Sequence, residues 1–200
     1  MTGKREENKK SNRELIIKSG IDVFLEKGIN QTTVRDIIRK TNLASGTFYN
    51  YFKSKEEVLV AALDDAAVQI GQVMRDQRKK AKNLEEFVLF QIEPFLKFAK
   101  EHSSIFLILN SNLNMVESFS IETPMMTLEL RYLREDVIAG IEQGILPNID
   151  VDYFCTSIQS VAEGVARTFI SKKDSKADID LAIKFCTNFI VSGVKSTQNV

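Results

Sequence analysis

Apolar residues recur along this chain every three to four positions, and no segment alternates convincingly in the manner of a β-strand. The spacing therefore predicts an all-α fold of about nine helices, with ends marked by capping residues, glycines and prolines. The expected helices are Arg13–Lys27, one capped by Thr33, one beginning at Ala44, Lys55 to about Lys80, one capped by Asn83 and kinked or split at Pro94, Ile105–Leu109, Pro124 to about Gln143, one capped by Asp150 and ending near Ser171, and Asp178 to about Val194.

The stretch 32–53, TTVRDIIRKTNLASGTFYNYFK, is the most informative part of the chain. Thr33 and Asp36 have the spacing of a capping box, which opens a short helix. Phe48 and Phe52 lie four positions apart and are expected to be buried together, which leaves the residues between them facing outward. Two short helices joined by a tight turn are the layout of a helix-turn-helix, whose second helix enters the major groove of DNA.

Residue types in this stretch indicate which side chains would meet DNA. Small side chains at the start of the second helix let the backbone approach base edges, and we expect Ser45 and Thr47 to contact bases beside Gly46. Hydroxyl and ammonium groups suit phosphate oxygens. The predicted DNA-binding residues are Thr33, Ala44, Ser45, Gly46, Thr47, Tyr49, Asn50, Lys53 and Lys55, with packing of Tyr49 against the first helix as an alternative.

Residues 13–63 resemble the DNA-binding domain of the TetR family of bacterial regulators. The family pattern F-x-E-x-G, T-x-x-x-I and G-x-x-Y-x-x-F-x-[ST]-K-E is matched in order and spacing by Phe24, Glu26, Gly28, Thr33, Ile37, Gly46, Tyr49, Phe52, Ser54, Lys55 and Glu56. Two positions depart from it: Ile38 stands where the family usually has alanine, and Asn42 where it usually has glycine. The first changes packing between helices, and the second is easily accommodated at a turn.

The resemblance implies a three-helix DNA-binding domain, expected at residues 1–55, and a larger helical domain for ligand binding and dimerisation at 56–200. The charge division agrees, because residues 1–55 hold 12 Lys and Arg against 6 Asp and Glu, while the remainder holds 15 against 21. The basic tail would either add phosphate or minor-groove contacts or form a solvated, disordered terminus, and its charged residues are Lys4, Arg5, Lys9, Lys10 and Arg13.

Phenylalanine and methionine are concentrated after residue 55 and suit the wall of an apolar pocket. The candidates for contact with a hydrophobic small-molecule effector are Phe87, Phe90, Phe98, Phe106, Met115, Phe119 and Met126, for each of which plain core packing is the alternative. Gln91 and Glu93 would supply polarity there, although surface positions are the simpler expectation.

The last two helices carry apolar residues on more than one face, which requires more than one neighbour. The resemblance implies that they pair with a second subunit. The candidate interface residues are Phe154, Ile158, Val161, Val165, Phe169, Phe185 and Phe189.

Other chemistry finds little support in the sequence. His102 is the only histidine and is expected to cap a helix, with a ligand contact as the alternative. No metal-type cluster or glycine-rich phosphate loop is present, so we expect no metal, no cofactor and no enzyme. Cys155 and Cys186 are expected to be small buried hydrophobic residues, with a redox role as the alternative. The absence of a long apolar run and of a hydrophobic leader predicts a cytoplasmic protein with no membrane partner.

Two functions follow from these expectations. The first is a homodimeric repressor that a hydrophobic or aromatic ligand releases from a palindromic, double-stranded operator. The second keeps DNA binding but replaces the ligand with a protein partner recruited by the larger domain.

Overall fold

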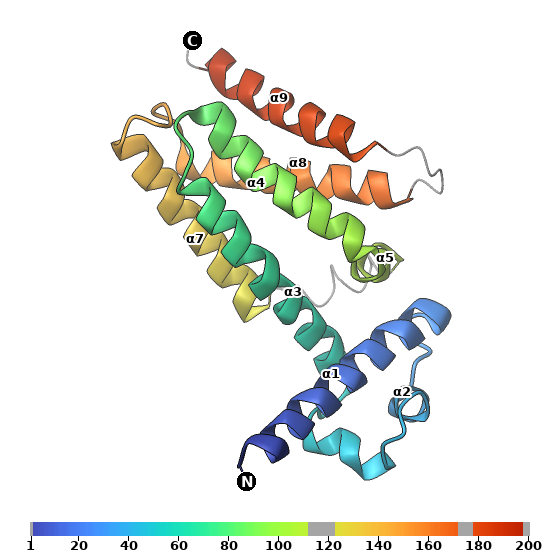
Figure 1. The fold of residues 1–200 in the computed structure, drawn as a ribbon. Helices are drawn as coiled ribbons and strands as arrows, with labels where there is room; N and C mark the ends of the chain where they lie inside the picture. The colour runs from blue at the N-terminus through green and yellow to red at the C-terminus, as the bar shows by residue number, and fades with distance from the viewer. Residues whose placement is uncertain (1, 112–122, 172–177, 198–200) are drawn as a thin grey trace. The chain divides into compact units, whose positions relative to one another are not determined.

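The computed structural model describes residues 2–111, 123–171 and 178–197, and over these ranges the chain is all-helical, with eight α-helices and one 3₁₀ helix (Figure 1). The chain divides into two compact units. The first contains residues up to Asp65 together with the stretch that begins at Ser104, and the second contains Ala66–Ser103 and the residues from Pro124 onward.

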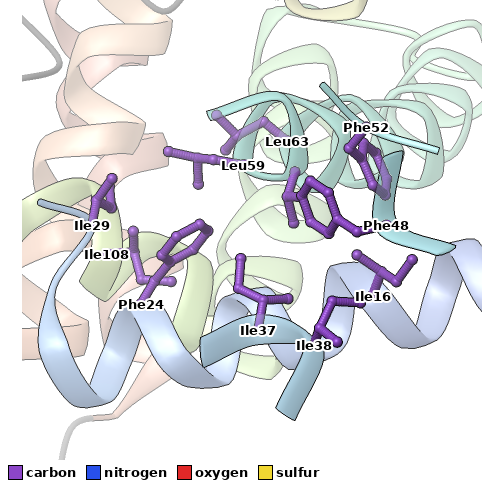
Figure 2. Close-up of a cluster of buried hydrophobic side chains, with 11 residues drawn as sticks. Ile16, Phe24, Ile29, Ile37, Ile38, Phe48, Phe52, Leu59, Leu63 and Ile108 are labelled. Atoms are coloured by element: carbon purple, nitrogen blue, oxygen red, sulfur yellow. The ribbon is translucent and has the colours of Figure 1, made fainter. Parts of the chain in front are cut away.

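The first unit is built from α1 (Thr2–Lys27), α2 (Val34–Arg39), η1 (Ser45–Asn50), the beginning of α3 (Lys55–Arg78) and α5 (Ser103–Ser111). Its core is a cluster of buried apolar side chains (Figure 2). Phe48 and Phe52 pack together as predicted, with their ring centroids 6.0 Å apart. Ile38, at the position where the family usually has alanine, is also part of this core.

Ile108 of α5 completes the same core, beside Phe24 and Ile29 (Figure 2). This contribution was not predicted, because the pattern Ile105–Leu109 shows only that a short helix has an apolar face and not which core receives it. The first compact unit therefore includes residues that lie well beyond position 55 in the sequence.

The ends of the first helices follow local signals. α1 ends at Lys27, and Gly28 follows with a φ of +77°, a conformation that glycine adopts without a steric cost. Thr33 caps α2 with the complete capping box to Asp36. Ser54 Oγ accepts from the N–H of Glu57 at 3.3 Å, and the Glu57 carboxylate accepts from the N–H of Lys53 at 2.7 Å, so the start of α3 is capped in a similar way.

α1 begins at Thr2, well before the predicted start at Arg13. The added turns are polar and exposed, so they have no apolar face for periodicity to detect. Lysine, arginine and glutamate are nevertheless good helix formers, and no proline interrupts them. The basic tail is therefore helical, and the expectation of a disordered terminus was wrong.

The segment predicted as the second helix of the helix-turn-helix is the 3₁₀ helix η1. A 3₁₀ helix has about three residues per turn, so side chains three positions apart lie above one another. Phe48 is consequently buried while its neighbours on either side, Thr47 and Tyr49, lie on different rows.

The second unit contains the rest of α3, α4 (Leu84–Glu101), α7 (Pro124–Glu142), α8 (Val151–Ser171) and α9 (Ile179–Thr197). α4 packs against both α8 and α9, and α7 packs against α8. α4 continues through Pro94 without a break, because its buried side chains on both sides of the proline hold it in place. No helix among the described residues combines the length and apolar character needed to cross a bilayer.

Candidate nucleic-acid interface

The start of the predicted reading segment is open to solvent. Ala44, Ser45 and Gly46 are exposed, and Thr47 is half-buried. A Cβ atom added at Gly46 would meet no heavy atom within 4 Å, so packing within the chain does not require glycine at this position. Glycine here instead keeps the backbone accessible from outside, which is the condition for close approach to a base edge.

Tyr49 projects outward from η1. Its side chain is 64% exposed, and its ring makes only an edge-to-face contact with Phe48, with centroids 5.5 Å apart. Packing of Tyr49 against α1 does not account for this exposure. Asn50 and Lys53 are exposed as well, so the unit offers a phenol, an amide and an ammonium group beyond the buried phenylalanines.

Thr33 is placed differently from the expectation of a phosphate ligand. Its backbone N–H and its hydroxyl both donate to Oδ2 of Asp36, at 3.0 and 2.7 Å. Lys27 donates to the other oxygen of the same carboxylate at 2.8 Å. The hydrogen bond from Lys27, followed by those from Thr33, holds the pKa of Asp36 well below its ordinary value. Thr33 therefore serves the start of α2, and a phosphate would have to displace one of these bonds.

Lys55 is likewise engaged within the chain. Its ammonium donates to three backbone carbonyls of the loop between α1 and α2, those of Ile29 at 2.7 Å, Asn30 at 3.1 Å and Thr32 at 2.8 Å. An ammonium group has three N–H bonds, so none remains for a phosphate in this arrangement. Sequence spacing could not reveal this, because the acceptors are main-chain atoms more than twenty residues away.

Further charged side chains of the first unit were not among the predicted residues. Arg35 and Arg39 of α2 are exposed, and among the described residues neither has an ion-pair partner. Arg13, which was expected to add phosphate or minor-groove contacts, forms a two-bonded ion pair with Asp65, at 2.7 and 3.3 Å, which joins α1 to α3. The two arginines could have been recognised in the sequence, because they lie on the face of α2 opposite its buried apolar residues.

The predicted effector contacts lie in several places. Phe87 is buried with its ring centroid 6.4 Å from that of Phe154, and Phe90 is half-buried. Phe98 is also half-buried and stacks on His102, whose ring lies 4.1 Å away at the C-terminal cap of α4. Met126 is exposed on α7, whereas Phe106 belongs to α5 in the first unit. Met115 and Phe119 lie outside the described residues.

A buried charged cluster joins α3, α4 and α7 in the second unit. Arg78 donates from Nε and Nη2 to Oδ2 of Asp136, at 2.9 and 2.7 Å, and from Nη1 to Oε1 of Gln91 at 2.5 Å. The expectation that Gln91 lies at the surface was wrong, since Gln91 is buried together with Arg78. Burial lowers the pKa of Arg78, and the neighbouring Asp136 opposes that effect.

Two more residues extend the charged cluster. The guanidinium of Arg75 lies 3.8 Å from the centre of the Tyr132 ring. The carboxyl group of Glu129 lies against Gly71, where an added Cβ would overlap it. Burial raises the pKa of Glu129 above its ordinary value. Among the described residues, Nε of Arg75 and Oε2 of Glu129 are buried without a hydrogen-bond partner.

The residues predicted for the dimer interface divide into two groups. Phe154 and Ile158 are buried within the chain and belong to the core of the second unit, where they have almost no surface to offer a partner. Val161, Val165 and Phe169 are half-buried on α8. Phe185 and Phe189 on α9 are 56% and 59% exposed, and their rings stack with centroids 5.9 Å apart.

Cys155 and Cys186 are both free thiols in the core of the second unit, as predicted. Burial raises the pKa of each to about 11. The reactive thiolate is therefore scarce at neutral pH.

Known proteins resemble the chain over different lengths. Residues 16–62 match the family model described as bacterial regulatory proteins, tetR family. A fatty acid metabolism regulator protein of Bacillus subtilis is 29% identical over 66% of this chain and 64% of its own length. The repressor KstR2 of Rhodococcus jostii is 25% identical over 96% of this chain and 95% of its own. The chain spans less than two thirds of the length of the first curated relatives it matches.

The solved structure of the transcriptional regulator FadR from Bacillus subtilis in complex with stearoyl-CoA shares the fold. Its TM-score is 0.76 at 22% identity, and the alignment covers 90% of this chain and 98% of that one. The family model covers the residues that form most of α1, α2, η1 and the beginning of α3. Residues 16–62 therefore form a DNA-binding domain of the TetR type, and the relatives and solved structures support a TetR-family transcriptional regulator.

Proposed function

We propose that this protein is a homodimeric, cytoplasmic repressor that binds a palindromic operator and leaves it when a hydrophobic small molecule binds. The observation that carries the DNA-binding part is the exposed segment from Ala44 to Asn50, supported from beneath by buried Phe48. A rigid core under an accessible polar surface is the arrangement that sequence reading in a major groove requires. Each subunit of the dimer would read one half-site.

In this proposal Ser45 and Thr47 contact bases, and Gly46 permits the close approach of the backbone. Tyr49 and Lys53 bind phosphate groups, with Asn50 beside them. Ala44 lies at the edge of the same surface. Thr33 supports the surface by capping α2, and in this proposal it does not contact a phosphate group.

The effector is proposed to be an acyl thioester or another molecule with a long apolar part. Its support comes from the relatives, one named as a regulator of fatty acid metabolism and another crystallised with stearoyl-CoA. The half-buried Phe90 and Phe98 of α4, together with Met126, are the described candidates for contact with it. Such a ligand acts only if it binds the DNA-bound and DNA-free forms with different affinity.

The first test is selection of duplexes from a random pool by the purified protein, followed by binding measurements over a range of salt concentrations. A palindrome with half-sites about one helical turn apart is expected. Lys53→Met should reduce the slope of log K against log salt by about 0.9 for each phosphate group that the protein no longer neutralises. Lys80→Met, an exposed charge of the second unit, should leave the slope unchanged and serves as the matched control.

The effector is tested on the selected duplex. Stearoyl-CoA is expected to release the protein, while free CoA at the same concentration should not. If the selection recovers no consensus sequence and only non-specific, charge-driven DNA binding is seen, the proposal of a specific operator is contradicted. Specific DNA binding that persists with every acyl-CoA offered would instead favour recruitment of a protein partner.

A further inference from the structure

We propose that Lys55 is a positioning residue of the DNA-binding unit, which holds the loop between α1 and α2 against the start of α3 without itself contacting DNA. The proposal rests on the proposed DNA-binding function. It also contradicts the assignment of Lys55 to phosphate binding that its place beside Lys53 suggests.

Convergence of three main-chain carbonyls on one ammonium is the primary observation. Nζ of Lys55 lies 2.7 Å from the oxygen of Ile29, 3.1 Å from that of Asn30 and 2.8 Å from that of Thr32. Oxygens aimed at one point repel one another unless a positive charge lies between them, and hydrogen bonds to a charged donor are stronger than neutral ones. The half-buried Lys55 supplies that charge.

The position of Lys55 in its helix makes an incidental contact a poor explanation. Lys55 is the first residue of α3, where the helix dipole favours a negative charge and where Glu56 and Glu57 follow. A lysine at this point is unfavourable for the helix by itself. Its three hydrogen bonds to the loop offset that cost. The presence of lysine at this position is therefore better explained by its contacts with the loop than by the stability of α3.

The loop that Lys55 holds determines where α2 begins. Gly28 turns the chain at a φ of +77°, and the hydroxyl of Thr32 donates back to the Gly28 carbonyl at 2.8 Å. Ile29 is anchored in the core. The peptide that follows the Thr32 carbonyl carries the N–H of Thr33, which completes the capping box of α2. By fixing that carbonyl, Lys55 fixes the direction in which α2 starts.

α2 in turn supports the reading segment. Its buried Ile37 and Ile38 share one core with Phe48 of η1 (Figure 2). A change in the start of α2 would therefore displace the surface from Ala44 to Asn50 relative to the beginning of α3. A displacement of about 1 Å is enough to weaken a set of directional contacts substantially. Lys55 would thus act on DNA affinity through geometry and not through its own charge.

The test compares Lys55→Met with Lys53→Met, since methionine keeps most of the stem and removes the charge. Binding is measured on the duplex selected by the wild-type protein over a range of salt concentrations. Lys55→Met is expected to lower affinity by about tenfold at every salt concentration and to leave the salt slope unchanged. Lys53→Met is expected to reduce the slope. The backbone amides of residues 28–33 should also exchange hydrogen faster in Lys55→Met alone.

Three outcomes would overturn the proposal. A reduced salt slope in Lys55→Met with unchanged exchange would establish a phosphate contact, and no change in either measurement would exclude any role. If Lys55→Met does not fold, Lys55→Arg replaces it, because arginine keeps the charge but its planar fork does not match three converging carbonyls. Full affinity in Lys55→Arg would also contradict positioning. Hydrogen exchange needs no DNA, so failure of the wild type to bind DNA would count against the proposed function alone.

Discussion

Arg78 and Asp136 form an ion pair inside the second unit, with Nη2 and Oδ2 2.7 Å apart and side chains only 1% and 11% exposed. The pair links α3 to α7, and the bond from Arg78 to Gln91 extends the link to α4. Three helices are therefore joined through one guanidinium. Two buried charges depend on each other, because each would be left without compensation if the other were removed.

Asp136→Ala is expected to lower the free energy of unfolding by about 3–5 kcal/mol, since it leaves the buried guanidinium of Arg78 without its carboxylate. Urea unfolding followed by circular dichroism measures the change. Glu93→Ala breaks the exposed pair with Lys97 on α4 and is the matched control, for which the unfolding midpoint should barely move. Equal effects of the two variants would mean that Arg78 finds another partner.

Gly71 and Glu129 should behave as a coupled pair. Alanine is a better helix residue than glycine by about 1 kcal/mol, so Gly71→Ala in a Glu129→Ala background should stabilise the protein by about that amount. In the wild-type background the added methyl group meets the Glu129 carboxyl, and the gain should be smaller or reversed. A double-mutant cycle of unfolding free energies checks the coupling, and strict additivity would argue against the contact.

Phe185→Arg together with Phe189→Arg should convert the proposed dimer to a monomer. The two rings are stacked, exposed and on one face of α9, so they provide apolar surface that burial against a second subunit would stabilise. Size-exclusion chromatography with light scattering gives the mass. Leu25→Arg, at an exposed leucine of α1, is the control and should leave the mass unchanged. A wild-type protein that is already monomeric would remove the basis of the prediction.

Asp36 predicts a specific dependence of stability on pH. Its pKa in the folded protein is lowered from 3.8, first by the hydrogen bond from Lys27 and then by those from Thr33. A carboxylate with a lowered pKa stabilises the folded state above its unfolded pKa and loses that effect as the pH falls towards its folded pKa. Asp36→Ala should therefore be less stable than the wild type from about pH 7 to about pH 5, and the difference should shrink below pH 3.8.

Thermal unfolding of both proteins at several pH values would give this difference directly. Asp76→Ala, which removes an exposed carboxylate from α3, is the control. A difference between Asp36→Ala and the wild type that persists undiminished at about pH 3 would contradict the role of the carboxylate.

Local signals made the first unit largely predictable. The capping box of Thr33, the stop at Gly28 and the burial of Phe48 with Phe52 each depend on residues close together in sequence, and the structure confirms all three. The 3₁₀ geometry of η1 was missed because a segment of 6 residues is too short for its spacing to distinguish a 3₁₀ helix from an α-helix.

Contacts between distant residues account for what sequence could not supply. The acceptors of Lys55 are backbone carbonyls, which carry no residue signature, and the burial of Arg78 depends on Asp136 in another helix. Phe154 and Phe185 likewise show that sequence alone does not reveal which apolar residues the chain buries in its own core. Both were predicted as interface residues, yet Phe154 is buried against Phe87 of α4 whereas Phe185 is exposed. α4 packs against both α8 and α9, so what distinguishes the two residues is which face of each helix meets α4.

Pro94 has a mechanical consequence for α4. Proline has no N–H, so the carbonyl of Phe90 lacks the donor that an α-helix normally supplies four residues later. The backbone ladder of α4 is weakest at mid-length, and helices bend where a rung is missing. Any bending of α4 is therefore expected near Phe90 and Pro94, so that its two halves can tilt by different amounts while each stays helical.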